Sequence, residues 1–314
     1  MEKTKLDVCI CTHNPRADVL RLTLESLAAQ SVAPSTFRVL LIDNASSLPL
    51  TAADLAPLAR RGIEHEIVVE SRLGLSRARI RAIDETRGGW ILFVDDDNEL
   101  QSDFIEIGLA LIDRHPEYGC FGGKLVLPEH LRPVAWVNPF LPYLGIKDYG
   151  DDVIVGDKDE WGPWEPAGAG AWVHRRVLDA YKAQSLQNEN FFKLGRTGHN
   201  NLASCDDSIL MRGAVRIGMK SAYEPSLVLH HHLSPHRFRF KYLMKLMHAY
   251  GGSHVVLETL LKGRQTLPDY YRTDGAFYKL LRWAFYGEKK KSLAFAVAQV
   301  AYHFGARAQH RKMK

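Results

Sequence analysis

The 314-residue sequence lacks the features that mark several classes of protein. No apolar stretch reaches the about 20 residues that a transmembrane helix needs. The charged start, Met1 to Lys5, is not followed by the apolar run of a signal peptide. Hydrophobic residues make up 46% and charged residues 25%, as in ordinary globular proteins. We therefore expect a folded cytoplasmic protein rather than a disordered, fibrous or membrane-spanning one.

Several familiar binding motifs are also missing. The four cysteines (Cys9, Cys11, Cys120 and Cys205) form no Cys-x-x-Cys pair, so a zinc ribbon or thioredoxin-like centre has no support. We expect buried thiols in a reducing compartment. No Gly-x-Gly-x-x-Gly follows the first apolar run, and no P-loop is present. These absences exclude the two commonest phosphate-binding loops.

Charge is low on average but unevenly placed. The chain has 41 Lys and Arg and 36 Asp and Glu, a net charge of +5. Residues 236–314 hold 16 basic and 4 acidic residues, a net of +12, whereas residues 1–235 hold 25 and 32, a net of −7. The sequence therefore predicts an acidic body, residues 1–235, and a basic C-terminal extension, residues 236–314.

The first third of the chain alternates between apolar β-branched runs and segments with helical spacing. The predicted strands are Leu6–Thr12, Phe37–Ile42, Glu66–Val69 and Trp90–Val94, and the predicted helices are Asp18–Gln30, Thr51–Arg60, Leu75–Thr86 and Gln101–Arg114. This alternation predicts an α/β fold with a Rossmann-like, mostly parallel sheet flanked by helices.

The remainder is less regular. Residues 118–170 are rich in Gly, Pro and aromatics, and we expect loops and short strands around a pocket there. Beyond them we expect helices at Val173–Lys182 and Ser208–Ile217, a polar loop at Gln184–His199 and a short strand at Ser226–Leu229.

Polar side chains follow each of the four predicted strands. These groups are Thr12-His13-Asn14, Asp43-Asn44, Glu70-Ser71-Arg72 and Asp95-Asp96-Asp97. Each alone could be a turn or a helix cap. Because open parallel sheets bind ligands beyond the carboxyl ends of their strands, we expect these groups to line one site.

The run Asp95-Asp96-Asp97 suggests a metal. Three adjacent carboxylates repel one another, and a divalent cation relieves that repulsion. Oxygen ligands favour Mg²⁺ or Mn²⁺, and a histidine would favour Mn²⁺. A solvated acidic turn that caps the next helix is the alternative.

These motifs, taken in order, resemble those of family 2 glycosyltransferases with the GT-A fold. The resemblance comprises Thr12-x-Asn14, Asp43-Asn-Ala-Ser, Arg72-Leu-Gly-Leu-Ser-Arg-Ala-Arg79, the Asp95–Asp97 strand end, Asp206-Asp207 before a helix, and Tyr-Glu-Pro-Ser-Leu-Val-Leu-His230. It covers about residues 6–233. It implies a catalytic domain over 1–235, with a nucleotide-binding half at about 1–115 and an acceptor half at about 116–235.

The resemblance also implies roles for the donor site. Asp43 would bind the base of the nucleotide, and Thr12 and Asn14 would lie beside it. Arg72, Arg77 and Arg79 would run along the nucleotide and diphosphate, where the fork of arginine suits phosphate. Asp95 and Asp97 would hold the metal, and Asp96 would reach the ribose.

Catalysis and acceptor binding fall on later motifs. By resemblance Asp207 is the catalytic base, which takes the proton of the acceptor hydroxyl as it attacks. Asp206 remains a rival, since Ile209 stands where the family usually has an acidic residue. His230 matches a metal-binding histidine, with His232 on the same face. Trp161, Trp164, Gly168 and Gly170 would line the acceptor site, the glycines allowing close approach.

The basic extension allows two interpretations. Phe240, Leu243, Met244, Met247 and Tyr250 follow helical spacing, and basic residues lie among them. Tyr278, Leu281, Trp283, Phe285, Lys289-Lys290-Lys291 and the uncharged residues 292–306 continue this pattern. The extension is either an interfacial helix on an anionic membrane, at the inner face of the plasma membrane, or a helical cover packed on the catalytic domain.

The sequence thus predicts an inverting, Mn²⁺- or Mg²⁺-dependent glycosyltransferase. We expect the donor to be a nucleoside diphosphate sugar, with UDP as the first choice of nucleotide. We expect the acceptor to be a glycan or a lipid-linked sugar in bacterial surface polysaccharide or glycolipid synthesis. A nucleotidyltransferase is the second enzyme hypothesis, although residues 12–16 lack its glycine-rich loop. A nucleic-acid-binding protein that uses the basic extension is the non-enzyme hypothesis, and the acidic body argues against it.

Overall fold

The computed structural model describes residues 6–198, 201–263 and 293–313. Its strands are β1 (Leu6–Thr12), β2 (Phe37–Asn44), β3 (Glu64–Glu70), β4 (Trp90–Val94), β5 (Asn98–Leu100), β6 (Tyr118–Val126), β7 (Ile154–Gly156), β8 (Ala171–His174) and β9 (Lys220–His231). Its α-helices are α1 (Ala17–Ala28), α2 (Ala56–Arg61), α3 (Leu75–Glu85), α4 (Phe104–Arg114), α5 (Arg175–Gln187), α6 (Asp206–Arg216), α7 (Phe240–Lys262) and α10 (Leu293–Met313). Short 3₁₀ helices are η1 (Pro34–Thr36), η2 (Ala135–Leu144), η3 (Glu189–Lys193) and η4 (Pro235–Phe238).

The strands form one sheet in the order β3-β2-β1-β4-β8-β6-β9-β5, with β7 beside β9. Strands β3, β2, β1 and β4 are parallel, as the alternating pattern predicts. Strand β8 runs antiparallel to both β4 and β6, and β9 runs parallel to β6. The start of β8 and the end of β9 therefore lie at the same edge as the ends of β1 and β4. This topology brings segments far apart in sequence to one edge of the sheet.

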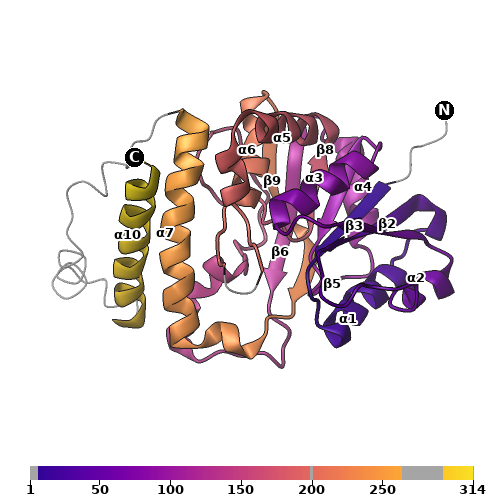
Figure 1. Cartoon of the computed structure of the whole chain (residues 1–314). Helices are drawn as coiled ribbons and strands as arrows, with labels where there is room; N and C mark the ends of the chain where they lie inside the picture. The colour runs from indigo at the N-terminus through magenta and orange to yellow at the C-terminus, as the bar shows by residue number, and fades with distance from the viewer. Residues whose placement is uncertain (1–5, 199–200, 264–292, 314) are drawn as a thin grey trace.

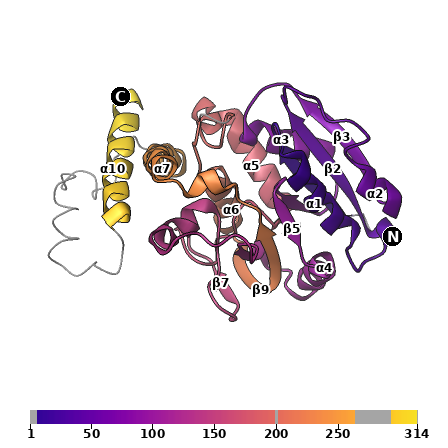
Figure 2. The same ribbon diagram turned by 90° about the horizontal axis from the view of Figure 1, so that it is seen from below.

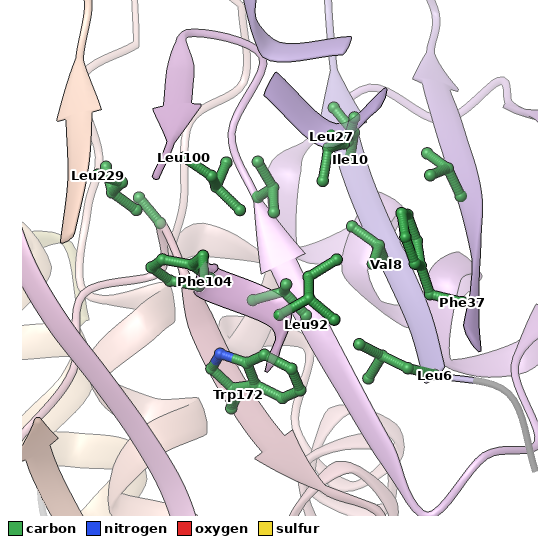
Figure 3. Packing of buried hydrophobic residues seen from close by; sticks show 14 of the residues in the cluster. Leu6, Val8, Ile10, Leu27, Phe37, Leu92, Leu100, Phe104, Trp172 and Leu229 are labelled. Atoms are coloured by element: carbon green, nitrogen blue, oxygen red, sulfur yellow. The ribbon is translucent and has the colours of Figure 1, made fainter. Parts of the chain in front are cut away.

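Two apolar layers cover the two faces of the sheet. Val8 and Ile10 of β1 point to the layer that contains Leu27 of α1 and Phe104 of α4 (Figure 3). Cys9, between them, points to the opposite layer, with residues of α3, α5 and α6. This period of two is what a strand buried on both faces requires.

Strand β6 is longer than the loops and short strands expected over residues 118–170, because residues 118–126 form one strand of 9 residues, although its pairing with β9 shifts register twice. Its glycines hid it, since glycine lowers strand propensity. They are required by packing: a Cβ on Gly123 would lie 1.9 Å from the carbonyl oxygen of Leu227, and one on Gly119 would lie 2.6 Å from the Cβ of Ala214. The expected polar loop after Gln184 is also partly helical, as α5 continues to Gln187 and η3 follows.

Helices α7 and α10 run side by side at the end of the molecule remote from β3 (Figure 1). Seen from below, α7 lies between α10 and the rest of the molecule (Figure 2). Leu243 and Met247 of α7 are buried with Phe140 of η2 and Phe295 of α10. Apart from Phe240, which is 48% exposed, the predicted apolar face of α7 therefore packs within this chain.

The structure describes only part of the basic extension, residues 236–314. Tyr278, Leu281, Trp283, Phe285 and Lys289–Lys291 lie outside the described residues. Across the ranges that are described, no helix combines the length and apolar character needed to cross a membrane.

Candidate active site

A cavity of about 560 Å³ opens at the edge where β1, β4 and β9 end. Its wall also includes the segment before β8, the start of α6, and residues of η2 and α7. Of the residues predicted from sequence, it is lined by Thr12, Asn14, Arg79, Asp95, Asp96, Asp97, Gly168, Asp206 and Asp207. A volume of this size suits a small organic ligand.

The three aspartates after β4 have different surroundings. The hydroxyl of Thr12 donates to Asp96, yet burial and the neighbouring charge of Asp97 raise the pKa of Asp96 to about 7. Burial and the charge of Asp97 also raise the pKa of Asp95. The cluster therefore holds more negative charge than its own surroundings stabilise, and it favours a cation.

Asp97 is paired with a histidine of β9. Its Oδ1 lies 3.1 Å from Nε2 of His231, and its Oδ2 lies 3.8 Å from a guanidinium nitrogen of Arg237. Burial acts to raise the pKa of Asp97, but His231 and Arg237 outweigh it and the pKa is lowered. Asp97 therefore has the lowest pKa of the three and is ionised at neutral pH.

Histidine 231, rather than His230, faces the cavity. Neighbouring residues of a strand point to opposite faces, and His231 continues the buried face of Leu227 and Leu229. His230 pairs with Val126 of β6 and is not among the residues that line the cavity. His232 instead binds the carboxylate of Glu99 at 2.8 Å.

The two acids that begin α6 are not equivalent. Asp206 is buried and accepts a hydrogen bond from the guanidinium of Arg79. Burial raises the pKa of Asp206, and the charge of Arg79 opposes that rise. Asp207 is half-buried, and its Oδ1 accepts from the amide of Ser208 at 2.9 Å. Both acids line the cavity, but Asp206 is buried against Arg79, whereas Asp207 is half-buried.

Gly168 lies between these groups. A Cβ at this position would lie 2.2 Å from Nη2 of Arg79 and 3.4 Å from the Cβ of Asp207. The absence of a side chain therefore lets the segment before β8 lie directly against the arginine and the acid.

A buried network supports the start of α6 from behind. The carboxylate of Glu165 accepts from the hydroxyl of Ser208 at 2.6 Å and from Nε of Arg212 at 3.0 Å. Arg212 also lies 4.0 Å from the carboxylate of Glu258 on α7. These contacts fix the start of α6, which carries Asp207, against the segment before β8 and against α7.

Three residues predicted for the donor site do not line the cavity. Asp43 accepts from the amides of Ser46 and Leu50, so its carboxylate shapes the loop after β2. Arg72 pairs with Glu70 at 3.0 Å. Arg77 lies over the ring of Phe192, 4.2 Å from its centroid.

Three residues predicted for the acceptor site also lie elsewhere. Trp161 is 59% exposed. Trp164 packs over Gly156 and Gly162, where an added Cβ would come within 2.2 Å and 2.5 Å of its ring. Gly170 has φ of 68°, and a Cβ there would meet Leu229 at 2.4 Å. In this structure Trp164 and Gly170 are closely packed, whereas Trp161 is exposed.

Sequence reasoning missed several residues that line the cavity. They are Arg16, Tyr143, Arg196, Arg237, Tyr242 and Tyr250 in addition to His231. Arg196 is half-buried. Burial acts to lower the pKa of its guanidinium, but Tyr242, Tyr250, Asp95 and Asp97 outweigh burial and the pKa is raised. The periodicity of the apolar residues before His231 was a usable signal for that histidine.

The residues fit a metal that is held jointly with a ligand rather than by the protein alone. Within residues 6–198, 201–263 and 293–313, no three His, Cys, Asp or Glu side chains are arranged as a metal cage. Mg²⁺ commonly takes one or two carboxylates and completes its shell with substrate phosphates. Two neighbouring ligand atoms, each about 2.1 Å from such an ion, lie about 3.0 Å from each other. Oδ1 of Asp97 and Nε2 of His231 lie 3.1 Å apart, which is close to that separation. The other ring nitrogen of His231, Nδ1, is buried with no hydrogen-bond partner among the described residues.

The family model for glycosyl transferase family 2 matches residues 7–180. The chain belongs to this family. It is therefore a glycosyltransferase, and the predicted architecture of a helix-flanked sheet followed by C-terminal helices is confirmed.

Solved structures of S. aureus TarS are similar to this family 2 member. Residues 1–349 of TarS share 14% identity with a TM-score of 0.45, and the match covers 99% of this chain and 92% of TarS 1–349. The complexes with UDP and with UDP-GlcNAc have the same coverage and TM-scores of 0.46, at 14% and 13% identity. A comparison with curated proteins gives no match.

Proposed function

We propose that the protein transfers a sugar from a nucleoside diphosphate sugar, with UDP as the nucleotide, to an acceptor hydroxyl with inversion at the anomeric carbon. One observation carries the proposal: a single cavity holds Asp95–Asp97 with His231 and, separately, Asp207 beside Gly168. A transferase of this kind needs a site for a charged leaving group and a base for the acceptor, and both are present.

Asp207 is the proposed base. It faces the cavity, and the nearby Asp206 is already engaged by Arg79. As the acceptor oxygen bonds to the anomeric carbon, its proton passes to Asp207 and the bond to the diphosphate breaks. One base with a departing diphosphate on the opposite side gives a single displacement, which inverts the anomeric configuration.

The donor would lie along the ends of β1 and β4. Thr12 and Asn14 line that part of the cavity, and Arg16, Arg196 and Arg237 supply positive charge for phosphate oxygens. Asp43 would act on the nucleotide through the loop after β2 that its carboxylate shapes. Arg72 and Arg77 do not line the cavity, so we propose that they contact only parts of the donor that extend beyond it.

A divalent metal, Mn²⁺ or Mg²⁺, would be held by Asp97 and His231, with Asp95 near them. It would supply charge neutralisation for the diphosphate leaving group. The histidine in this set is His231 in place of His230. The surplus negative charge of the aspartate run, seen in the raised pKa of Asp96, supports a cation there.

The acceptor is proposed to be a glycan or a lipid-linked sugar. Contact with an anionic membrane would use the outer face of α10, since the apolar face of α7 is buried. Leu293 and Phe304 are each 56% exposed, and the exposed Arg307 and Arg311 follow on the same helix.

We also propose the division of the chain into a catalytic domain, residues 1–235, and a C-terminal extension, residues 236–314.

The decisive experiment is a thermal-shift panel of UDP, GDP and dTDP sugars, each with and without Mn²⁺, followed by assay of sugar release. We expect the UDP sugars to raise Tm most, with a larger rise when Mn²⁺ is added. A rise with a different nucleotide would correct the donor. The absence of a shift and of sugar release with every donor would contradict the proposal.

A further inference from the structure

The cavity has two unlike walls. The wall at the ends of β1 and β4 is charged and includes Asp95–Asp97 and Arg16. A second wall is aromatic and comes from η2 and α7: it contains Tyr143, Tyr242 and Tyr250. All three tyrosines are half-buried, so part of each ring packs in the fold while the remainder faces the cavity.

The aromatic wall is held rigidly. The rings of Tyr143 and Tyr250 meet edge to face, with centroids 5.4 Å apart and planes at 88°. The ring of Tyr242 meets His236 in the same way, at 5.3 Å and 87°. Edge-to-face pairs favour one orientation of each ring, so the exposed parts of these rings are presented in fixed positions.

Tyr250 and the proposed base, Asp207, line the same cavity. The charge of Asp207 is, after burial, the largest influence that raises the pKa of the Tyr250 hydroxyl. The loop that leads to α6 is also tied to α7, because the amide of Ser204 donates to the hydroxyl of Ser253 at 3.0 Å. The helix that carries Tyr250 and the helix that carries Asp207 are therefore fixed relative to each other.

We propose that Tyr143 and Tyr250 form the acceptor subsite and that they bind the ring of a pyranose, whose hydroxyl is thereby presented to Asp207. This inference rests on the proposed function, which supplies the base and the donor. It replaces Trp161 and Trp164, which lie away from the cavity, as the aromatic side chains of the acceptor site.

The chemistry of the two walls assigns donor and acceptor to different parts of the lining. A nucleoside diphosphate needs cations, and Arg16 of the first wall is one of those that line the cavity. A pyranose ring offers an apolar C–H face and a rim of hydroxyls, which suits an aromatic ring with a polar group at its edge. An acyclic polyol has the same hydroxyls without a fixed apolar face, so the wall should distinguish the two.

The test compares acceptors and variants with the donor identified by the thermal-shift panel. Methyl glucoside, methyl galactoside and methyl mannoside serve as pyranose probes, and sorbitol serves as the acyclic probe. The variants are Tyr143→Leu, Tyr250→Leu and Tyr250→Phe. Phe240→Leu is the matched control, because Phe240 is an exposed aromatic of the same helix that does not line the cavity. Each is assayed for glycoside transfer, donor hydrolysis by water and donor affinity.

We expect the unchanged chain to prefer a pyranose probe over sorbitol. Each Tyr→Leu variant should lower kcat/KM for that probe about ten-fold, mainly through acceptor KM, with donor affinity and hydrolysis retained. Tyr250→Phe should keep most of the transfer, since it keeps the ring, and Phe240→Leu should match the unchanged chain.

Three results would overturn the inference while leaving the proposed function intact. They are transfer to sorbitol as efficient as to pyranoses, donor hydrolysis with no transfer to any pyranose, and Tyr→Leu variants that transfer normally or lose hydrolysis and transfer equally. A chain that neither binds nor cleaves any donor would instead contradict the proposed function, and this inference with it.

Discussion

Arg79 of α3 and Asp206 of α6 form a buried ion pair in the lining of the cavity, with side chains 4% and 7% exposed. The pair joins a helix from the first half of the chain to the helix that carries Asp207. Because it occupies Asp206, it distinguishes two adjacent acids that look interchangeable in the sequence.

The pair should be needed for stability as much as for chemistry. Asp206→Ala leaves the guanidinium of Arg79 buried without its partner, and loss of one member of a buried pair costs about 3–5 kcal/mol. Urea unfolding would measure the change in the free energy of unfolding. Arg21→Ala is the control, since it breaks the exposed Arg21–Glu25 pair, which should contribute at most about 1 kcal/mol. Equal small effects for the two variants would contradict this account.

The close approach at Gly168 predicts that one methyl group there impairs turnover. Gly168→Ala places a Cβ against Arg79 and displaces the guanidinium or the segment that leads to β8. A displacement of about 1 Å in an active site can cost about 100-fold in rate, and we expect a loss of that order. Gly89→Ala is the matched control, because no atom lies within 4 Å of a Cβ at Gly89. Normal turnover of the Gly168 variant would show that the segment does not position the site.

The two neighbouring histidines of β9 should behave differently. His231→Ala should weaken the Mn²⁺-dependent part of donor binding about ten-fold or more, because it removes one of two proposed protein ligands. His230→Ala should leave it unchanged. Isothermal titration of UDP with and without Mn²⁺, and after EDTA treatment, separates the two. A stronger effect at His230 would restore the assignment made from the sequence spacing.

The C-terminal helices should depend on two glycines. A Cβ on Gly251 would lie 1.9 Å from the carbonyl oxygen of Tyr302, and one on Gly305 would lie 1.8 Å from that of His248. Gly251→Ala should therefore destabilise the chain by about 1–3 kcal/mol. Gly252→Ala is the neighbouring control, since its Cβ would make an ordinary contact of 3.5 Å with Gln309. Similar Tm values for the two variants would contradict close packing of α7 and α10.

The sequence predicts best those elements whose local residue pattern matches their burial in the fold. Strands β1 and β4 match the predicted Leu6–Thr12 and Trp90–Val94 because their apolar runs are buried on both faces. The polar groups at their ends lie in the cavity, as the parallel topology requires. The family resemblance over the first part of the chain is confirmed by the match to residues 7–180.

Where tertiary contacts decide, the sequence falls short. β6 was hidden by glycines that other segments require, and the side of β9 that faces the cavity depends on its position in the sheet. Tyr143 and Tyr250 reach the cavity through the packing of η2 and α7, and Arg196 reaches it from the segment between η3 and α6. No local pattern indicates either arrangement. A boundary drawn where the net charge changes also separated Arg237, Tyr242 and Tyr250 from the site that they line.

The most direct test of the central claim is turnover of Asp207→Asn, measured together with donor affinity on the same preparation. The substitution keeps the size of the side chain and removes the base. The account predicts unchanged donor affinity and unfolding, with a fall in transfer on the order of 100- to 10,000-fold, the usual contribution of a general base. Transfer close to that of the unchanged chain would contradict the assignment of Asp207 as the base.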